Sequence, residues 1–99
     1  MIPEKALEEA RQSLREKLQK RIDDGDRTAV MQFASYHAML LEEADFETAY
    51  VWYSIATAIG LPGALELRDD ARENVDDEKI AELQVEAGTI FETLDVASN

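Results

Sequence analysis

The chain has 99 residues, 45% of them apolar, and a formal net charge of −12. This length suits one small domain with its own core, and the absence of cysteine excludes disulfide bonds and thiolate metal sites. The electrostatic field of a chain with this net charge repels nucleic acid and anionic membranes. The lack of cysteine fits a reducing cytosol, and residues 1–5 lack the apolar segment of a signal peptide, so we expect a cytoplasmic protein.

The negative charge is unevenly distributed along the chain. Residues 1–23 carry six basic and five acidic side chains, a net charge of +1, whereas residues 24–99 carry four basic and seventeen acidic ones, a net charge of −13. Solubility is the simpler explanation of this acidity, and attraction of a basic protein partner is the alternative.

The first predicted helix spans Pro3–Ile22, and Pro3 suits a first turn because the N–H that proline lacks would have no partner there. Its apolar stripe is narrow and consists of Leu7, Leu14, Leu18 and Ile22, with Ala10 beside it. Such a stripe is typical of a packing seam. We expect the seam to pack on the rest of the domain, and a second copy of the chain is the alternative partner.

The segment from Asp23 to Asp26 predicts a turn, with Asp26 as the N-cap of the next helix. Its acidic run is superficially similar to a calcium loop. The twelve-residue ligand pattern and its terminal glutamate are absent, so we expect no metal site here.

The second predicted helix spans Arg27–Glu43, with an apolar face formed by Ala29, Val30, Phe33, His37, Leu40 and Leu41. Residues 28–41 contain no Asp, Glu, Lys or Arg, so the opposite side of this helix is uncharged as well. Either the first helix covers that side, or a partner binds there, and methionine is common at adaptable binding surfaces. The predicted contact residues are Met31, Gln32, Ser35 and Met39.

The third predicted helix lies between Asp45, an N-cap, and Gly60, which can adopt the left-handed conformation that ends helices. One apolar stripe consists of Ala49, Trp52, Tyr53, Ala56 and Ile59, and the other face carries Tyr50, Val51, Ile55 and Ala58. We therefore expect this helix at the centre of the domain. The uncharged run 48–65 is not a membrane span, because Gly60, Pro62 and Gly63 interrupt it.

Two further helices complete the prediction. The fourth spans Pro62–Asn74, and the fifth starts after an N-cap at Asp76 and runs to Leu94. The apolar positions of the fifth helix are Ile80, Leu83, Ala87, Ile90, Phe91 and Leu94. Residues 95–99 are expected to be a frayed tail.

A set of residues in the third helix carries a family resemblance: Asp45, Phe46, Ala49, Trp52, Tyr53, Ala56 and Gly60. The pattern continues at Ala64, Leu67, Arg68 and Asp69, and a closing helix follows. Residues 27–90 thus resemble a Sel-one-like repeat, a relative of the tetratricopeptide repeats. The glycines usual in the loop before this helix are missing, and residues 39–43 stand in their place, which favours a short turn.

The resemblance implies an all-α fold of about five helices, arranged as antiparallel helical hairpins in a right-handed array. Residues 1–99 would then form a single domain, with an N-terminal helix at 1–23, a repeat hairpin at 27–60 and capping helices at 62–94. It also implies a non-catalytic adaptor or scaffold of bacterial type that binds another protein.

The residues themselves show no catalytic constellation. His37 is the only histidine, and its apolar neighbours favour a packed core position over a catalytic or metal-binding role. We therefore expect no enzyme, cofactor or metal. The expected partner is another protein, and the acidity favours one with a basic surface. Direct binding to nucleic acid or membrane is not expected.

A second function remains open. The chain could be an acidic inhibitor or nucleic-acid mimic that occupies a basic groove on its target. A homodimer through the first or second helix is compatible with either function.

Overall fold

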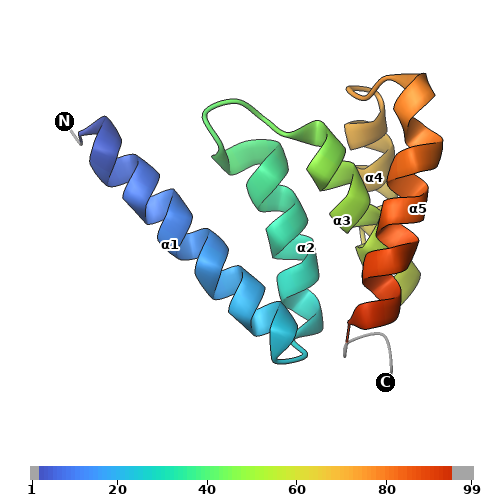
Figure 1. Ribbon diagram of the computed structural model, residues 1–99, viewed down its shortest axis with the longest axis horizontal. Helices are drawn as coiled ribbons and strands as arrows, with labels where there is room; N and C mark the ends of the chain where they lie inside the picture. The colour runs from blue at the N-terminus through green and yellow to red at the C-terminus, as the bar shows by residue number, and fades with distance from the viewer. Residues whose placement is uncertain (1–2, 95–99) are drawn as a thin grey trace.

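The computed structural model describes residues 3–94, in which every regular element is helical (Figure 1). The elements are α1 (Glu4–Asp23), α2 (Arg27–Ser35), the π-helical turn η1 (Tyr36–Leu40), α3 (Phe46–Ile59), α4 (Ala64–Arg72) and α5 (Asp77–Thr93). Because η1 continues α2 directly, residues 3–94 form five helices, and the predicted all-α class is confirmed. The predicted tail, 95–99, lies outside the described residues.

The helices form a flat layered body that measures 41 × 32 × 21 Å. Helix α1 lies at one edge and packs on α2, while α3 lies in the middle and packs on α2, α4 and α5 (Figure 1). None of the helices in residues 3–94 is long and apolar enough to cross a membrane.

Both predicted ends of α3 are confirmed. The Asp45 carboxylate accepts hydrogen bonds from the backbone N–H and the hydroxyl of Thr48, at 3.1 and 2.7 Å. At the other end Gly60 has φ +90°, a conformation that costs little only for glycine. The buried residues of α3 come from both faces: Ala49, Tyr50, Val51, Trp52, Tyr53, Ile55 and Ala56. The central position expected for this helix is therefore confirmed.

The second helix ends earlier than predicted, at Leu40 instead of Glu43. Its last turn widens into η1, and Leu41 then adopts an extended conformation with ψ 152°. The backbone N–H of Asp45 donates a hydrogen bond to the carbonyl of His37 at 2.8 Å, which closes the reversal into α3. A helix that continued to Glu43 would leave only Ala44 to reverse the chain before the Asp45 cap, so the tertiary connection overrides helix propensity.

Two smaller predictions were also wrong. The fourth helix starts at Ala64, because Pro62 and Gly63 form a turn in which Gly63 has φ +81°. Asp76 does occupy the N-cap position of α5, but its side chain caps nothing, and only its carbonyl accepts the N–H of Lys79, at 2.9 Å.

Helix α1 packs on the body through its C-terminal half alone. Leu18 and Ile22 are 3% and 0% exposed, whereas Leu7 and Leu14 keep 39% and 38% of their surface exposed. The start of α1 diverges from α2, so the two helices form a V that is closed at the turn after Asp23 (Figure 1). The predicted packing of the stripe on the domain is thus confirmed only for its second half.

Candidate interaction surface on α2

The four predicted contact residues lie along one line of α2 and η1, on which Gln32 and Met39 are exposed and Met31 and Ser35 are half-buried. Met31, Gln32, Ser35 and Met39 follow helical spacing, and we call this line the α2 ridge. Gln32, Ser35 and Met39 form one wall of a groove of about 440 Å³ between α1 and α2. The rest of the groove is lined by Leu14, Leu18, Arg21, Tyr36 and Leu40. The groove is largely apolar and lies where α1 leaves the ridge uncovered.

Smaller hollows flank the ridge at both ends. Met31 and Gln32 line one of about 260 Å³ beside Leu61 and Pro62. Met39 also lines one of about 330 Å³ between η1, α3 and α4, whose other residues include Leu67, Asp70 and Asn74. The structure therefore brings all four predicted residues onto one surface with apolar depressions beside it.

An aromatic cluster supports the ridge from below. The ring of Phe33 meets those of Trp52 and His37 edge-on, with centroids 4.8 Å apart in both cases. His37 is buried, and its Nδ1 donates a hydrogen bond to the carbonyl of Phe33 at 2.9 Å. On the ridge itself, the Ser35 hydroxyl pairs with that of Tyr53 at 2.8 Å. The predicted core position of His37 is confirmed.

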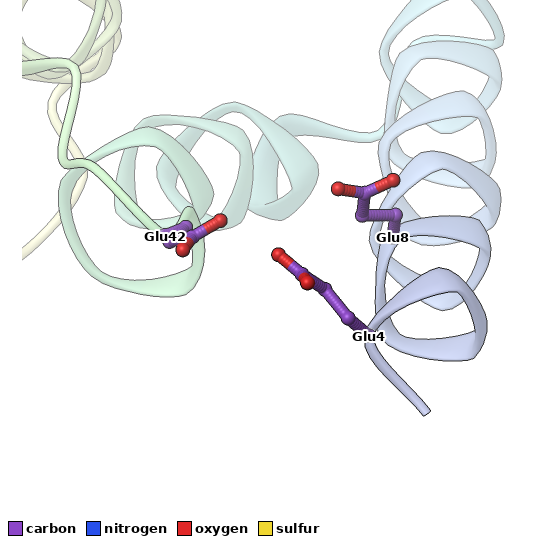
Figure 2. A group of neighbouring side chains, drawn as sticks. All are labelled: Glu4, Glu8 and Glu42. Atoms are coloured by element: carbon purple, nitrogen blue, oxygen red, sulfur yellow. The ribbon is translucent and has the colours of Figure 1, made fainter. Parts of the chain in front are cut away.

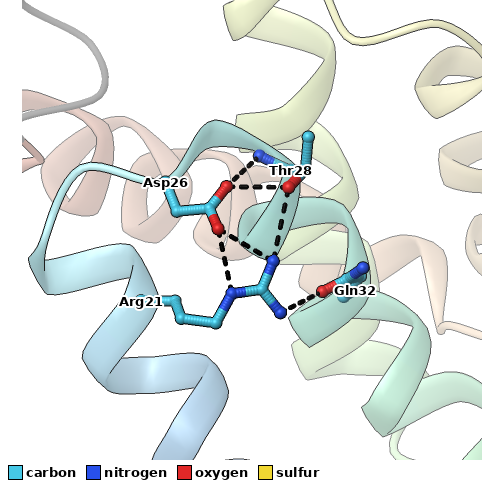
Figure 3. A network of polar contacts seen from close by, with 4 residues as sticks. All are labelled: Arg21, Asp26, Thr28 and Gln32. Atoms are coloured by element: carbon cyan, nitrogen blue, oxygen red, sulfur yellow. Dashed lines mark hydrogen bonds and ion pairs between the residues drawn. The ribbon is translucent and has the colours of Figure 1, made fainter.

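A polar network closes the narrow end of the V (Figure 3). The Arg21 guanidinium on α1 donates to Asp26 at 2.9 Å and to the side-chain oxygen of Gln32 at 2.7 Å. Asp26 in turn caps α2 by accepting from the backbone N–H and the hydroxyl of Thr28, at 3.0 and 2.7 Å. The network joins α1 to α2 and so sets the width of the groove at this end.

The Thr28 hydroxyl, with help from the Arg21 guanidinium, holds the pKa of Asp26 below its ordinary value of 3.8. A carboxylate with a lowered pKa in the folded state contributes stability above its unfolded pKa, and this contribution disappears as the pH falls through the folded pKa. We therefore expect Asp26→Asn to be less stable than the wild type near neutral pH, with a difference that shrinks below about pH 4. Thermal unfolding of both proteins across this pH range measures the effect. An equal difference at every pH would show that the charge of Asp26 plays no part.

Charged side chains of opposite sign flank the ridge. On the α1 side, Lys17 lies four residues before Arg21 on the same flank of the helix. On the α4 side, Glu66 lies four residues before Asp70, which lines the hollow beside Met39. In the described part of the chain, Lys17, Glu66 and Asp70 are exposed and make no ion pair. This pattern could not be predicted from the sequence, because it depends on the positions of α1 and α4 relative to α2.

Three carboxylates meet at the open end of the V (Figure 2). Oxygens of Glu4 and Glu8 on α1 and of Glu42 after η1 all lie within 4.8 Å of one another, and all three residues are exposed. Exposed acidic groups gather in this way without an ion, so the cluster is not assigned as a metal centre. Their mutual repulsion favours the separation of the start of α1 from the loop at Glu42.

Comparisons of the chain with protein-family models, with curated proteins and with solved structures find no match. The resemblance to a Sel-one-like repeat therefore stays a hypothesis drawn from the residues of α3. Within residues 3–94, every fully buried side-chain nitrogen and oxygen has a hydrogen-bond partner.

Proposed function

We propose that this protein is a non-catalytic interaction module that binds another protein through the α2 ridge and the groove beside it. The observation that carries the proposal is an exposed apolar surface: Met39 is 66% exposed and Leu40 48%, beside a largely apolar groove of about 440 Å³. Contiguous apolar surface on a soluble protein is typical of an interaction site. Residues 28–41, which supply the ridge, carry no charge in a chain whose net charge is −12.

The composition of the surface supports binding to a protein rather than to a small molecule. The groove is open to solvent, and Met39 on its wall is an unbranched side chain of a type that adapts readily to different partners. The resemblance of residues 27–90 to a Sel-one-like repeat supports the same role, that of an adaptor or scaffold of bacterial type in the cytoplasm.

A charge placed at Met39 tests the proposal. We expect Met39→Glu to keep the fold, because the side chain is mostly exposed, and to weaken capture of the partner at least tenfold, because a carboxylate would be buried without a counter-charge. The measurement is affinity capture from the native host with the wild type and the variant as baits. The matched control is Val85→Glu, which makes the same kind of change at a residue that is 70% exposed on α5.

The two variants separate the possible outcomes. Loss of the partner with Met39→Glu but not with Val85→Glu supports the ridge as the binding surface. Equal capture by both variants would reject it. If Met39→Glu unfolds the protein, as circular dichroism would show, the ridge is part of the core and the proposal fails.

The acidity favours a second candidate, an inhibitor or nucleic-acid mimic that occupies a basic groove on its target. Residues 24–99 carry a net charge of −13, and such a field draws in basic partners over a long range. Repeating the capture at high salt distinguishes the two functions. A mainly apolar contact at the ridge keeps its partner at high salt, whereas an electrostatic mimic loses it.

A further inference from the structure

The charges that flank the α2 ridge have a regular arrangement. Arg21 bonds to Gln32 at the lower end of the ridge, and Lys17 lies one turn further along α1 towards Met39. On the opposite flank, the Glu66 carboxylate and the Met31 methyl group lie beside the same glycine, Gly63. A basic group on α1 and an acidic group on α4 therefore lie on opposite sides of the same end of the α2 ridge.

Asp70 completes this arrangement at the upper end. It lines the same hollow as Met39, and it lies one turn beyond Glu66 on α4. Helix α4 runs in the same direction as α2, while α1 runs in the opposite direction (Figure 1). One turn back along α1 from Arg21 to Lys17 and one turn forward along α4 from Glu66 to Asp70 therefore lead the same way along the ridge.

A surface of this kind is complementary to itself. A two-fold axis parallel to α2, between two facing ridges, places the ridge of one copy on the ridge of the other. The rotation reverses the order of the α1 and α4 flanks in the second copy. The α1 flank of each copy then faces the α4 flank of the other. Lys17 and Asp70, which make no ion pair within residues 3–94, therefore meet in both halves of the contact, while Arg21 keeps its bonds to Asp26 and Gln32. The exposed Met39 side chains meet near the axis.

We infer that the α2 ridge binds a second copy of this chain, in a two-fold dimer in which the basic flank of each copy meets the acidic flank of the other. The inference rests on the proposed function, since it takes the same surface and names its occupant. The ridge is also where two chains with a net charge of −12 can approach with least repulsion, because residues 28–41 carry no charge and residues 1–23 have a net charge of +1.

The size of the molecule allows such a contact. A dimer interface of standard size covers about 800 Å² on each partner. The broad face of the body measures 41 × 32 Å, and α1, α2 and α4 all contribute to the ridge and its flanks. The contact would bury the exposed surface of Met39 and Leu14 that the fold leaves open.

Reversal of each flanking charge, in two separate variants, tests the inference. Lys17→Glu places acid against acid in both halves of the dimer, and Asp70→Lys places base against base, so each variant is expected to dimerise about tenfold more weakly than the wild type. An equimolar mixture of the two variants restores both attractive contacts, and the mixed dimer is expected to form as well as the wild-type dimer. Sedimentation velocity of the full chain at low salt measures all four samples.

The control is Glu86→Lys, which makes a similar change of net charge at an exposed position of α5 and is expected to leave dimerisation unweakened. A wild-type protein that stays monomeric up to hundreds of micromolar would overturn the inference, as would a mixture that fails to restore association. Either result leaves the proposed function standing if capture of a different protein still depends on Met39. Conversely, the mixture of the two variants could dimerise as expected while affinity capture finds no other protein. That result would limit the function to self-association.

Discussion

Trp52→Ala is expected to lower the free energy of unfolding by about 3–5 kcal/mol, which is the usual cost of deleting a large aromatic side chain from a core. Trp52 is 8% exposed, and its ring meets that of Phe33 edge-on at a centroid distance of 4.8 Å. This contact joins α3 to α2 directly beneath the α2 ridge. Because domains generally have about 5–15 kcal/mol of stability, this loss is expected to remove a large part of the stability of the protein.

Urea denaturation followed by far-UV circular dichroism measures the loss. Trp52→Phe serves as the control, because it keeps an aromatic ring against Phe33 and should cost clearly less than the alanine variant. A loss below about 1 kcal/mol for Trp52→Ala would contradict a core position for this side chain and would reopen it as a binding residue.

Ala56→Leu is expected to destabilise the protein by about 1–3 kcal/mol through overpacking. Ala56 is 0% exposed on the central helix, which packs on α2, α4 and α5, so a larger side chain has no free space to enter. The same denaturation experiment measures the effect. Ala58→Leu is the matched control, because Ala58 lies on the same helix but is exposed, and its substitution should change the stability by less than about 0.5 kcal/mol. Equal costs at the two positions would show that α3 is not packed as described.

Helix α3 could be predicted from the sequence because its signals are local. A capping aspartate at Asp45, a left-handed glycine at Gly60 and apolar residues at helical spacing between them act within a few residues, whatever surrounds the helix. The apolar character of both faces also placed this helix at the centre correctly, since only a helix enclosed by others can bury both faces.

The features that the sequence did not reveal depend on contacts between distant segments. The residues after Leu40 favour helix locally, yet the chain turns there so that Asp45 can reach the carbonyl of His37. The divergence of α1 is a second case. Its apolar stripe continues to Leu7, but the rest of the domain buries only Leu18 and Ile22 in the last two turns of α1, so Leu7 and Leu14 remain partly exposed.

The candidate surface was predicted in part. The absence of charge from residues 28–41 pointed to Met31, Gln32, Ser35 and Met39, and the structure places these four along one line of α2 and η1, with only Gln32 and Met39 fully exposed. The hollows beside the ridge and the opposite charges on its flanks could not be predicted, because they require the positions of α1 and α4 relative to α2. A contact between Lys17 of one molecule and Asp70 of another cannot be predicted from the spacing of residues along one sequence.

The most direct measurement of the central claim is an NMR spectrum of the protein with isotope-labelled methionine methyl groups, because Met31 and Met39 both lie on the α2 ridge. We expect the Met39 signal to shift and broaden when a binding protein is added, or when the concentration of the chain itself is raised. Val85→Glu should leave this response unchanged. A protein that binds the chain while both methyl signals keep their positions would contradict the assignment of the ridge as the interaction surface.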